Sequence, residues 1–89
     1  MNKTVTINIS GIIFHIDEDA FNSLSAYLNK IKVKFSNNES GSEILADIES
    51  RIAELLSQKI SNAKQVVLLN DVNSVMETLG KPEDFADAE

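Results

Sequence analysis

Apolar and polar residues alternate over residues 4–17 in the way that two paired β-strands require. A two-residue turn at Ser10-Gly11 would bring the strands together in antiparallel fashion, with Ile9 opposite Ile12. One face of this hairpin then carries six large apolar side chains: Val5, Ile7, Ile9, Ile12, Phe14 and Ile16. A second layer need not cover the other face, which carries Thr4, Thr6, Asn8, Ile13 and His15.

Two amphipathic helices are predicted after the hairpin. Asp17 would cap the first, over about residues 18–35, and its apolar residues recur at three- and four-residue steps: Phe21, Leu24, Leu28, Ile31 and Phe35. The second would begin at the capping box Ser40-Gly41-Ser42-Glu43 and end near Ile60. Its inward positions are Ile44, Ile48, Ile52, Leu55 and Leu56.

A short third strand and a last helix complete the predicted fold. Residues 66–69 form an unbroken β-prone run, which suits a strand buried on both faces. Asn70 or Asp71 would cap a helix that Gly80 and Pro82 end. The order is then ββααβα, and we expect one small two-layer α+β domain over residues 1–82, with the strands packed against two long helices and the C-terminal helix. Residues 83–89 are predicted to be an acidic tail or the start of a linker.

Length and charge narrow the functions open to this chain. Its 89 residues suffice for one modest core. A net charge of −6 opposes binding to DNA, RNA or anionic lipid, although Lys30, Lys32 and Lys34 form one small basic cluster. Without cysteine there is no disulfide or thiolate chemistry. No run approaches the roughly 20 apolar residues of a membrane span and no signal peptide is evident, so we expect a cytoplasmic chain with any membrane anchor outside these residues.

Candidate chemistry along the chain is sparse. His15 is the only histidine, and no nucleophile or orienting carboxylate is expected beside it, so we interpret it as a residue of the open hairpin face. The carboxylates of the second helix lack the spacing and central glycine of a calcium loop, and the two Ser-Gly turns lack the pattern of a phosphate loop. We therefore expect no enzyme activity, no cofactor and no metal.

Exposed apolar residues and strand edges point instead to contact with another protein. The predicted interaction surface combines the open hairpin face, the polar face of the second helix and the one aromatic residue of the tail: Ile13, His15, Asp47, Glu49, Arg51, Glu54 and Phe85. The sequence leaves open the alternative that the termini or the last helix cover the sheet edges and the apolar members of this surface.

Three blocks of the sequence, taken together, resemble a known family. They are residues 4–9 with 11–20 (TVTINI and GIIFHIDEDA), residues 43–55 (EILADIESRIAEL) and residues 80–85 (GKPEDF). In this order they resemble the N-terminal cytoplasmic region of phage-shock-protein C (PspC) domain proteins of the Bacteroidetes type. The blocks extend over nearly the whole chain.

This resemblance implies a regulatory role. Such proteins are regarded as stress-responsive transcriptional regulators linked to envelope stress, and the region precedes a PspC domain with a membrane-spanning segment, which these 89 residues do not contain. The resemblance supplies no catalytic residue. It implies a cytoplasmic interaction domain that contacts a protein partner or itself, on the cytoplasmic side of the inner membrane if the chain is part of a longer anchored protein. The negative charge, rather than the resemblance, indicates that this domain does not bind nucleic acid directly. The closest alternative is a homo-oligomerisation domain with no other partner.

Overall fold

The elements follow one another in the predicted order. A computed structural model of the chain describes residues 3–36 and 39–81. Its strands and helices are β1 (Thr4–Ile9), β2 (Ile12–Asp17), α1 (Glu18–Lys34), α2 (Gly41–Lys59), β3 (Val66–Val67) and α3 (Leu69–Leu79). The α+β class and the order ββααβα are therefore confirmed. The acidic tail predicted over residues 83–89, with Phe85, lies outside the described residues.

The hairpin has the register that the alternation predicts. β1 and β2 pair antiparallel from Ile9 opposite Ile12 outward to Thr4 opposite Asp17. Both turn residues have positive φ angles, 54° at Ser10 and 84° at Gly11, as a tight two-residue hairpin turn requires. Beside β2 runs β3, in parallel, so the sheet order is β1-β2-β3 and β1 forms one edge.

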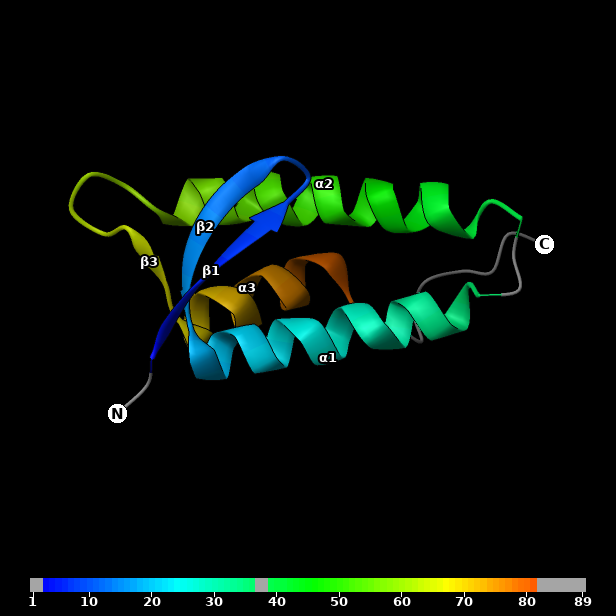
Figure 1. Cartoon of the computed structure of the whole chain (residues 1–89), viewed down its shortest axis with the longest axis horizontal. Coiled ribbons are helices and arrows are strands. Elements are labelled where there is room, and N and C mark those ends of the chain that lie inside the picture. The colour runs from blue at the N-terminus through cyan, green and yellow to red at the C-terminus, as the bar shows by residue number, and fades with distance from the viewer. Residues whose placement is uncertain (1–2, 37–38, 82–89) are drawn as a thin grey trace.

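The sheet lies on one side of a helix pair, and α3 fills the other side (Figure 1). α1 and α2 run in opposite directions, and the hairpin crosses from the start of α1 to α2. Behind them, α3 contacts both long helices. This arrangement buries one face of the sheet against the helices and leaves its other face uncovered by any described element.

The described residues share one hydrophobic cluster, built from the buried face of the sheet and the inward stripes of the helices. Its largest fully buried side chains are Phe14, Ile16, Ile31, Ile52, Leu56, Val67, Val72 and Val75. One residue of the predicted apolar face departs from the expectation: Ile12 is 42% exposed, although Ile9 opposite it is buried. The reason is that the hairpin approaches α2 mainly through β1.

The start of α3 differs from the prediction. The strand ends at Val67, with Val66 only half-buried, and the helix begins at Leu69 with Leu68 at the N-cap position. Asp71, expected at the cap, stands in the third helical position and accepts the Leu68 N–H at 3.0 Å. The N-terminus of α3 is therefore capped by a carboxylate from within its first turn, and this carboxylate accepts the Leu68 N–H, which would otherwise lack a partner.

The predicted N-cap positions of the two long helices are confirmed, but the side chains at these positions do not form the hydrogen bonds expected of a cap. Neither Asp17 nor Ser40 makes a side-chain cap hydrogen bond. Instead, the Glu18 N–H donates to the Lys3 carbonyl at 2.7 Å, so backbone beside the first strand satisfies the start of α1. At the start of α2, a Cβ on Gly41 would lie 2.3 Å from the Phe35 carbonyl oxygen, so glycine is required for this close approach.

An ion pair fixes the chain between α2 and α3. The Lys64 ammonium donates a hydrogen bond to the buried Asp71 carboxylate, which also holds the Leu68 N–H. Burial by itself would raise the pKa of Asp71, but the hydrogen bonds from Lys64 and Leu68 and the positive charges of Lys64 and Lys59 outweigh it and lower this pKa. The ionised form of Asp71 is therefore favoured in the folded protein.

Because the pKa of Asp71 is lower in the folded than in the unfolded chain, its ionised form adds stability above the unfolded pKa. This contribution is lost as the pH falls through the folded pKa. We expect Asp71→Asn to lower the free energy of unfolding by about 1–3 kcal/mol at neutral pH, and by less in acid. Urea denaturation of both proteins from about pH 2 to pH 7 measures the difference, and a difference that is constant over this range would contradict the assignment.

A second buried polar contact joins α1 to the end of α3. The Tyr27 hydroxyl donates to the Gly80 carbonyl at 2.7 Å, and burial raises the pKa of Tyr27. We expect Tyr27→Phe to lower the free energy of unfolding by about 1 kcal/mol, because the Gly80 carbonyl loses its donor. Thr78→Val, which removes an exposed hydroxyl bound to the Ser74 carbonyl, should change stability by less than about 0.5 kcal/mol. An equal loss of unfolding free energy in the two variants would show that the buried Tyr27 hydrogen bond contributes no more to stability than the exposed one of Thr78.

Candidate protein-interaction surface

The uncovered face of the sheet carries the residues that the alternation predicts. Thr4, Thr6, Asn8, Ile13 and His15 are all exposed. Ile13 is the apolar exception among them and exposes 56% of its surface. A single exposed apolar residue is common on protein surfaces, so Ile13 bears on function only together with the groove that it lines beside β2.

His15 makes an ordinary cross-strand contact on this face. Its Nδ1 lies 3.2 Å from the hydroxyl oxygen of Thr6, the residue opposite it in the hairpin. Hydroxyl and imidazole face solvent, and within the part of the chain that the structure describes no carboxylate is hydrogen-bonded to the ring. This pair stabilises the hairpin and gives the face one site that both donates and accepts hydrogen bonds.

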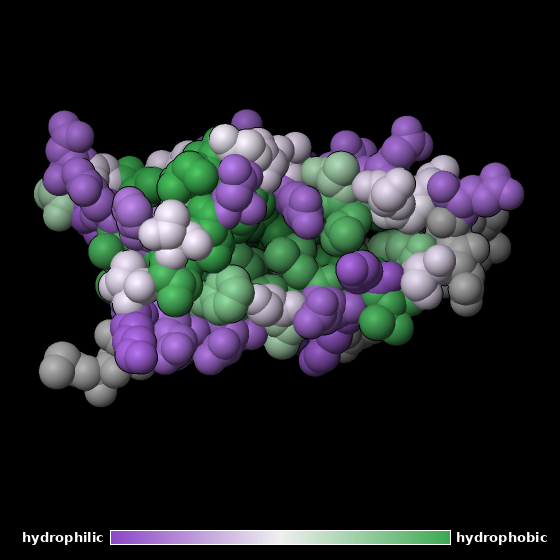
Figure 2. All heavy atoms as spheres, viewed as in Figure 1, coloured by the Kyte–Doolittle hydropathy of each residue, from purple (hydrophilic) through white to green (hydrophobic). Residues whose placement is uncertain are grey.

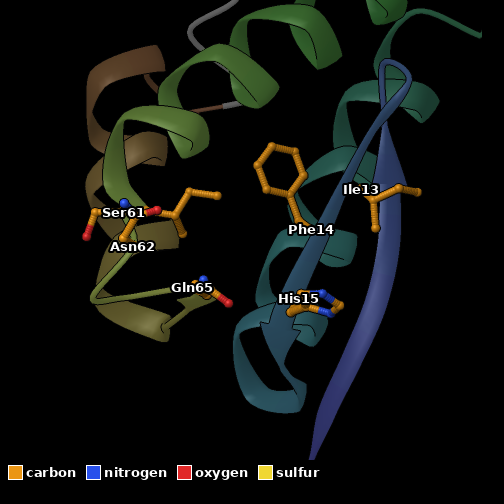
Figure 3. A pocket seen from close by; sticks show the side chains of 7 residues that line it. Ile13, Phe14, His15, Ser61, Asn62 and Gln65 are labelled. Atoms are coloured by element: carbon orange, nitrogen blue, oxygen red, sulfur yellow. The ribbon is translucent and has the colours of Figure 1, made fainter.

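A shallow groove of about 340 Å³ runs beside β2, between this strand and the connection from α2 to β3. Figure 3 shows Ile13 and His15 on the solvent side of β2, Phe14 on the opposite side, and polar side chains on the facing connection. The groove is lined by Ile13, Phe14, His15, Ile60, Ser61, Asn62 and Gln65. Two of the predicted surface residues, Ile13 and His15, are thus brought together with polar residues from a distant part of the chain.

The groove is open because β3 is short. β3 pairs with β2 only at His15–Ile16, and the preceding connection turns away, with Ser61 and Lys64 exchanging backbone hydrogen bonds of 2.7 and 3.1 Å. A two-residue hairpin makes Ile9 and Ile12 a hydrogen-bonded pair, and such pairs alternate along the strand with non-bonded ones. The Ile13 amide and carbonyl therefore point away from β1, toward the groove.

The polar face of α2 is only partly as predicted. Asp47, Arg51 and Glu54 are exposed at four- and three-residue spacing and share one side of the helix. Glu49 is half-buried, and at about 100° per residue it lies roughly opposite Asp47 around the axis. Glu49 therefore does not share a side of α2 with the other three predicted residues. None of these four residues lines the groove beside β2.

Three polar residues of the groove were not singled out by the sequence. Ser61, Asn62 and Gln65 belong to an exposed connection whose composition predicts only a loop. They become part of a site because β3 places the connection next to β2. No signal within the connection itself indicates that pairing.

Comparisons with known proteins do not place the chain in a family: no family model, curated protein or solved structure matches it. Among the described residues, no cluster of three or more His, Cys, Asp or Glu side chains could hold a metal ion. The described helices include none with the length and apolar character needed to cross a membrane.

If Ile13 serves contact rather than folding, its removal should hardly affect stability. We expect Ile13→Thr to change the free energy of unfolding by less than about 0.5 kcal/mol. Phe14→Ala, at the neighbouring buried position, should cost about 3–5 kcal/mol. Chemical denaturation of the two variants compares the positions directly, and a loss above about 2 kcal/mol for Ile13→Thr would show that the residue belongs to the core.

Proposed function

We propose that this chain is a non-catalytic protein-interaction domain that binds its partner through the open face of the sheet and the groove beside β2. The observation that carries the proposal is Ile13, a large apolar residue that is 56% exposed at the rim of a groove with polar walls. The net charge of −6 supports a protein rather than a nucleic acid as the partner.

The resemblance to the N-terminal region of PspC-domain proteins supports a regulatory setting for this contact. In that setting the domain lies in the cytoplasm and passes on the state of a stress-responsive, membrane-anchored protein through contacts with another protein. Any effect on transcription follows from those contacts. The proposal assigns no catalytic residue and no cofactor to the chain.

Self-association is the second candidate function. Ile12 and Ile13, 42% and 56% exposed, are neighbours in sequence and point to opposite faces of the hairpin near its turn. An isologous contact between two copies would cover the same residues on both. In that case the partner is a second copy of this chain.

Site-specific photo-cross-linking tests the proposal. A photoreactive residue replaces Ile13 in one protein and Val33, an apolar residue of α1 that is 73% exposed, in the control. In cells that express the protein, we expect a discrete cross-linked species from position 13 and none from position 33. An adduct of twice the mass of the chain assigns self-association, and a larger or smaller one assigns a different protein. Equal labelling from both positions, or none from position 13, would refute the proposed surface.

A further inference from the structure

Among residues 3–36 and 39–81, no strand pairs with the outer edge of β1, which leaves this edge open for hydrogen bonding. β1 is the end strand of the sheet, with β2 on its other side. Since Ile9 and Ile12 form the hydrogen-bonded pair that closes the turn, the residues that bond to β2 are Val5, Ile7 and Ile9. The backbone amides and carbonyls of Thr4, Thr6 and Asn8 therefore point outward, away from the sheet.

Nothing in the sequence of β1 protects this edge. Folded proteins usually block a free edge strand with a lysine, a proline, a bulge or an inward-pointing charge. The six residues TVTINI contain no charge and no proline, and their register with β2 runs without a bulge from Thr4 to Ile9. Such a strand is a ready template for another extended segment.

An apolar hollow lies beside the open edge. α1 and α2 continue well past the hairpin on the side of β1 (Figure 1), and Figure 2 shows hydrophobic residues in the hollow between the two helices there. Leu28 of α1 and Leu45 of α2 are half-buried side chains that pack against the hydrophobic core and stay partly open to solvent. At the far end of the helix pair, where α1 ends and α2 begins, a cavity of about 390 Å³ is lined by Lys32, Phe35, Ser36, Glu39, Gly41, Ser42 and Leu45.

We propose that a partner protein adds one extended segment to β1 as a fourth strand, so that alternate apolar side chains of the segment enter the hollow between α1 and α2. The outward amides and carbonyls of Thr4, Thr6 and Asn8 supply the backbone hydrogen bonds. The inference rests on the proposed function, since it states how the interaction domain holds its protein partner.

The geometry favours a lone segment over the sheet edge of a second copy. Antiparallel pairing of β1 with another β1 would relate two copies by a half-turn through the shared edge. The helices of both copies would then lie on the same side of the joined sheet, where α1 and α2 extend past β1 and would run into their counterparts. A lone extended segment, which brings no helices of its own, could pair with β1 without colliding with α1 and α2.

Charge and burial define the chemistry of the segment. Positions that face the hollow suit Val, Ile or Leu, because the floor is hydrophobic. The far cavity carries one residue of each sign, Lys32 and Glu39, and does not select by charge. The net charge of −6 favours Lys or Arg at the positions of the segment that face solvent.

A proline at Thr6 tests the proposal against a matched control. Thr6→Pro removes an outward N–H that the hairpin does not use, and edge strands tolerate proline at such positions. Thr6→Ala keeps this N–H and loses the same contact with His15. A displayed library of random peptides of about ten residues, the upper range of a strand, is selected against the full chain, and each selected peptide is then titrated with both variants.

We expect the selected peptides to alternate apolar with polar or basic residues. Their affinity should fall at least about tenfold for Thr6→Pro, since one hydrogen bond and the close approach of the backbones are lost, and by less than about twofold for Thr6→Ala. If circular dichroism shows that Thr6→Pro does not fold, Thr4→Pro with Thr4→Ala repeats the comparison at the first residue of the strand.

The result separates this inference from the proposed function. Peptides that Ile13→Thr weakens and Thr6→Pro does not would overturn strand addition at β1 while leaving the open sheet face as an interaction surface. A library that yields no peptide, or only peptides that are insensitive to Thr6→Pro, also overturns strand addition. Cross-linking from position 13 then decides separately whether the domain binds a protein at all.

Discussion

The parallel pairing of Val66 and Val67 with His15 and Ile16 is the constraint on which the rest of the fold depends. Parallel neighbours in a sheet need a long crossover connection, and here α1 and α2 together provide it. Both helices lie on the same side of the sheet, with α3 behind them. The helices that this pairing requires thus build the hydrophobic core on one face of the sheet, and no described element covers the opposite face.

Local patterns predicted the elements well, because each depends on neighbours in sequence. The hairpin register follows from alternation around Ser10-Gly11, and the helix stripes follow from three- and four-residue spacing. The prediction failed at the start of α3, where a buried ion pair rather than the type of the residues decides the structure. Val66–Leu69 looks like one strand, but Asp71, held by Lys64, begins a helix at Leu69. Glu49 is a different case, because about 100° per residue already places it on another side of α2 than Asp47, so helical periodicity is enough to separate the two residues.

The candidate surface could likewise be predicted only where it depends on neighbours in sequence. Ile13 and His15 follow from alternation, which assigns every second residue of a strand to one face. Ser61, Asn62 and Gln65 could not be foreseen, since they meet β2 only through a parallel pairing about fifty residues along the chain. The open edge of β1 likewise depends on the order of the strands, which a hairpin and a short apolar run do not determine.

The turn of the hairpin shows how the orientation of the exposed face is maintained. Ser10 holds a left-handed backbone conformation that costs a residue with a side chain about 1 kcal/mol. Its hydroxyl lies 3.0 Å from that of Ser50 on α2. This contact between two exposed hydroxyls is weak, whereas the other end of the hairpin is secured by the buried Ile16 and by β3. Ile9, next to the turn, is also buried, so lifting the tip of the hairpin from α2 would expose an apolar side chain at a cost of about 1.5–3 kcal/mol, and the uncovered face of the sheet keeps its orientation relative to the helices.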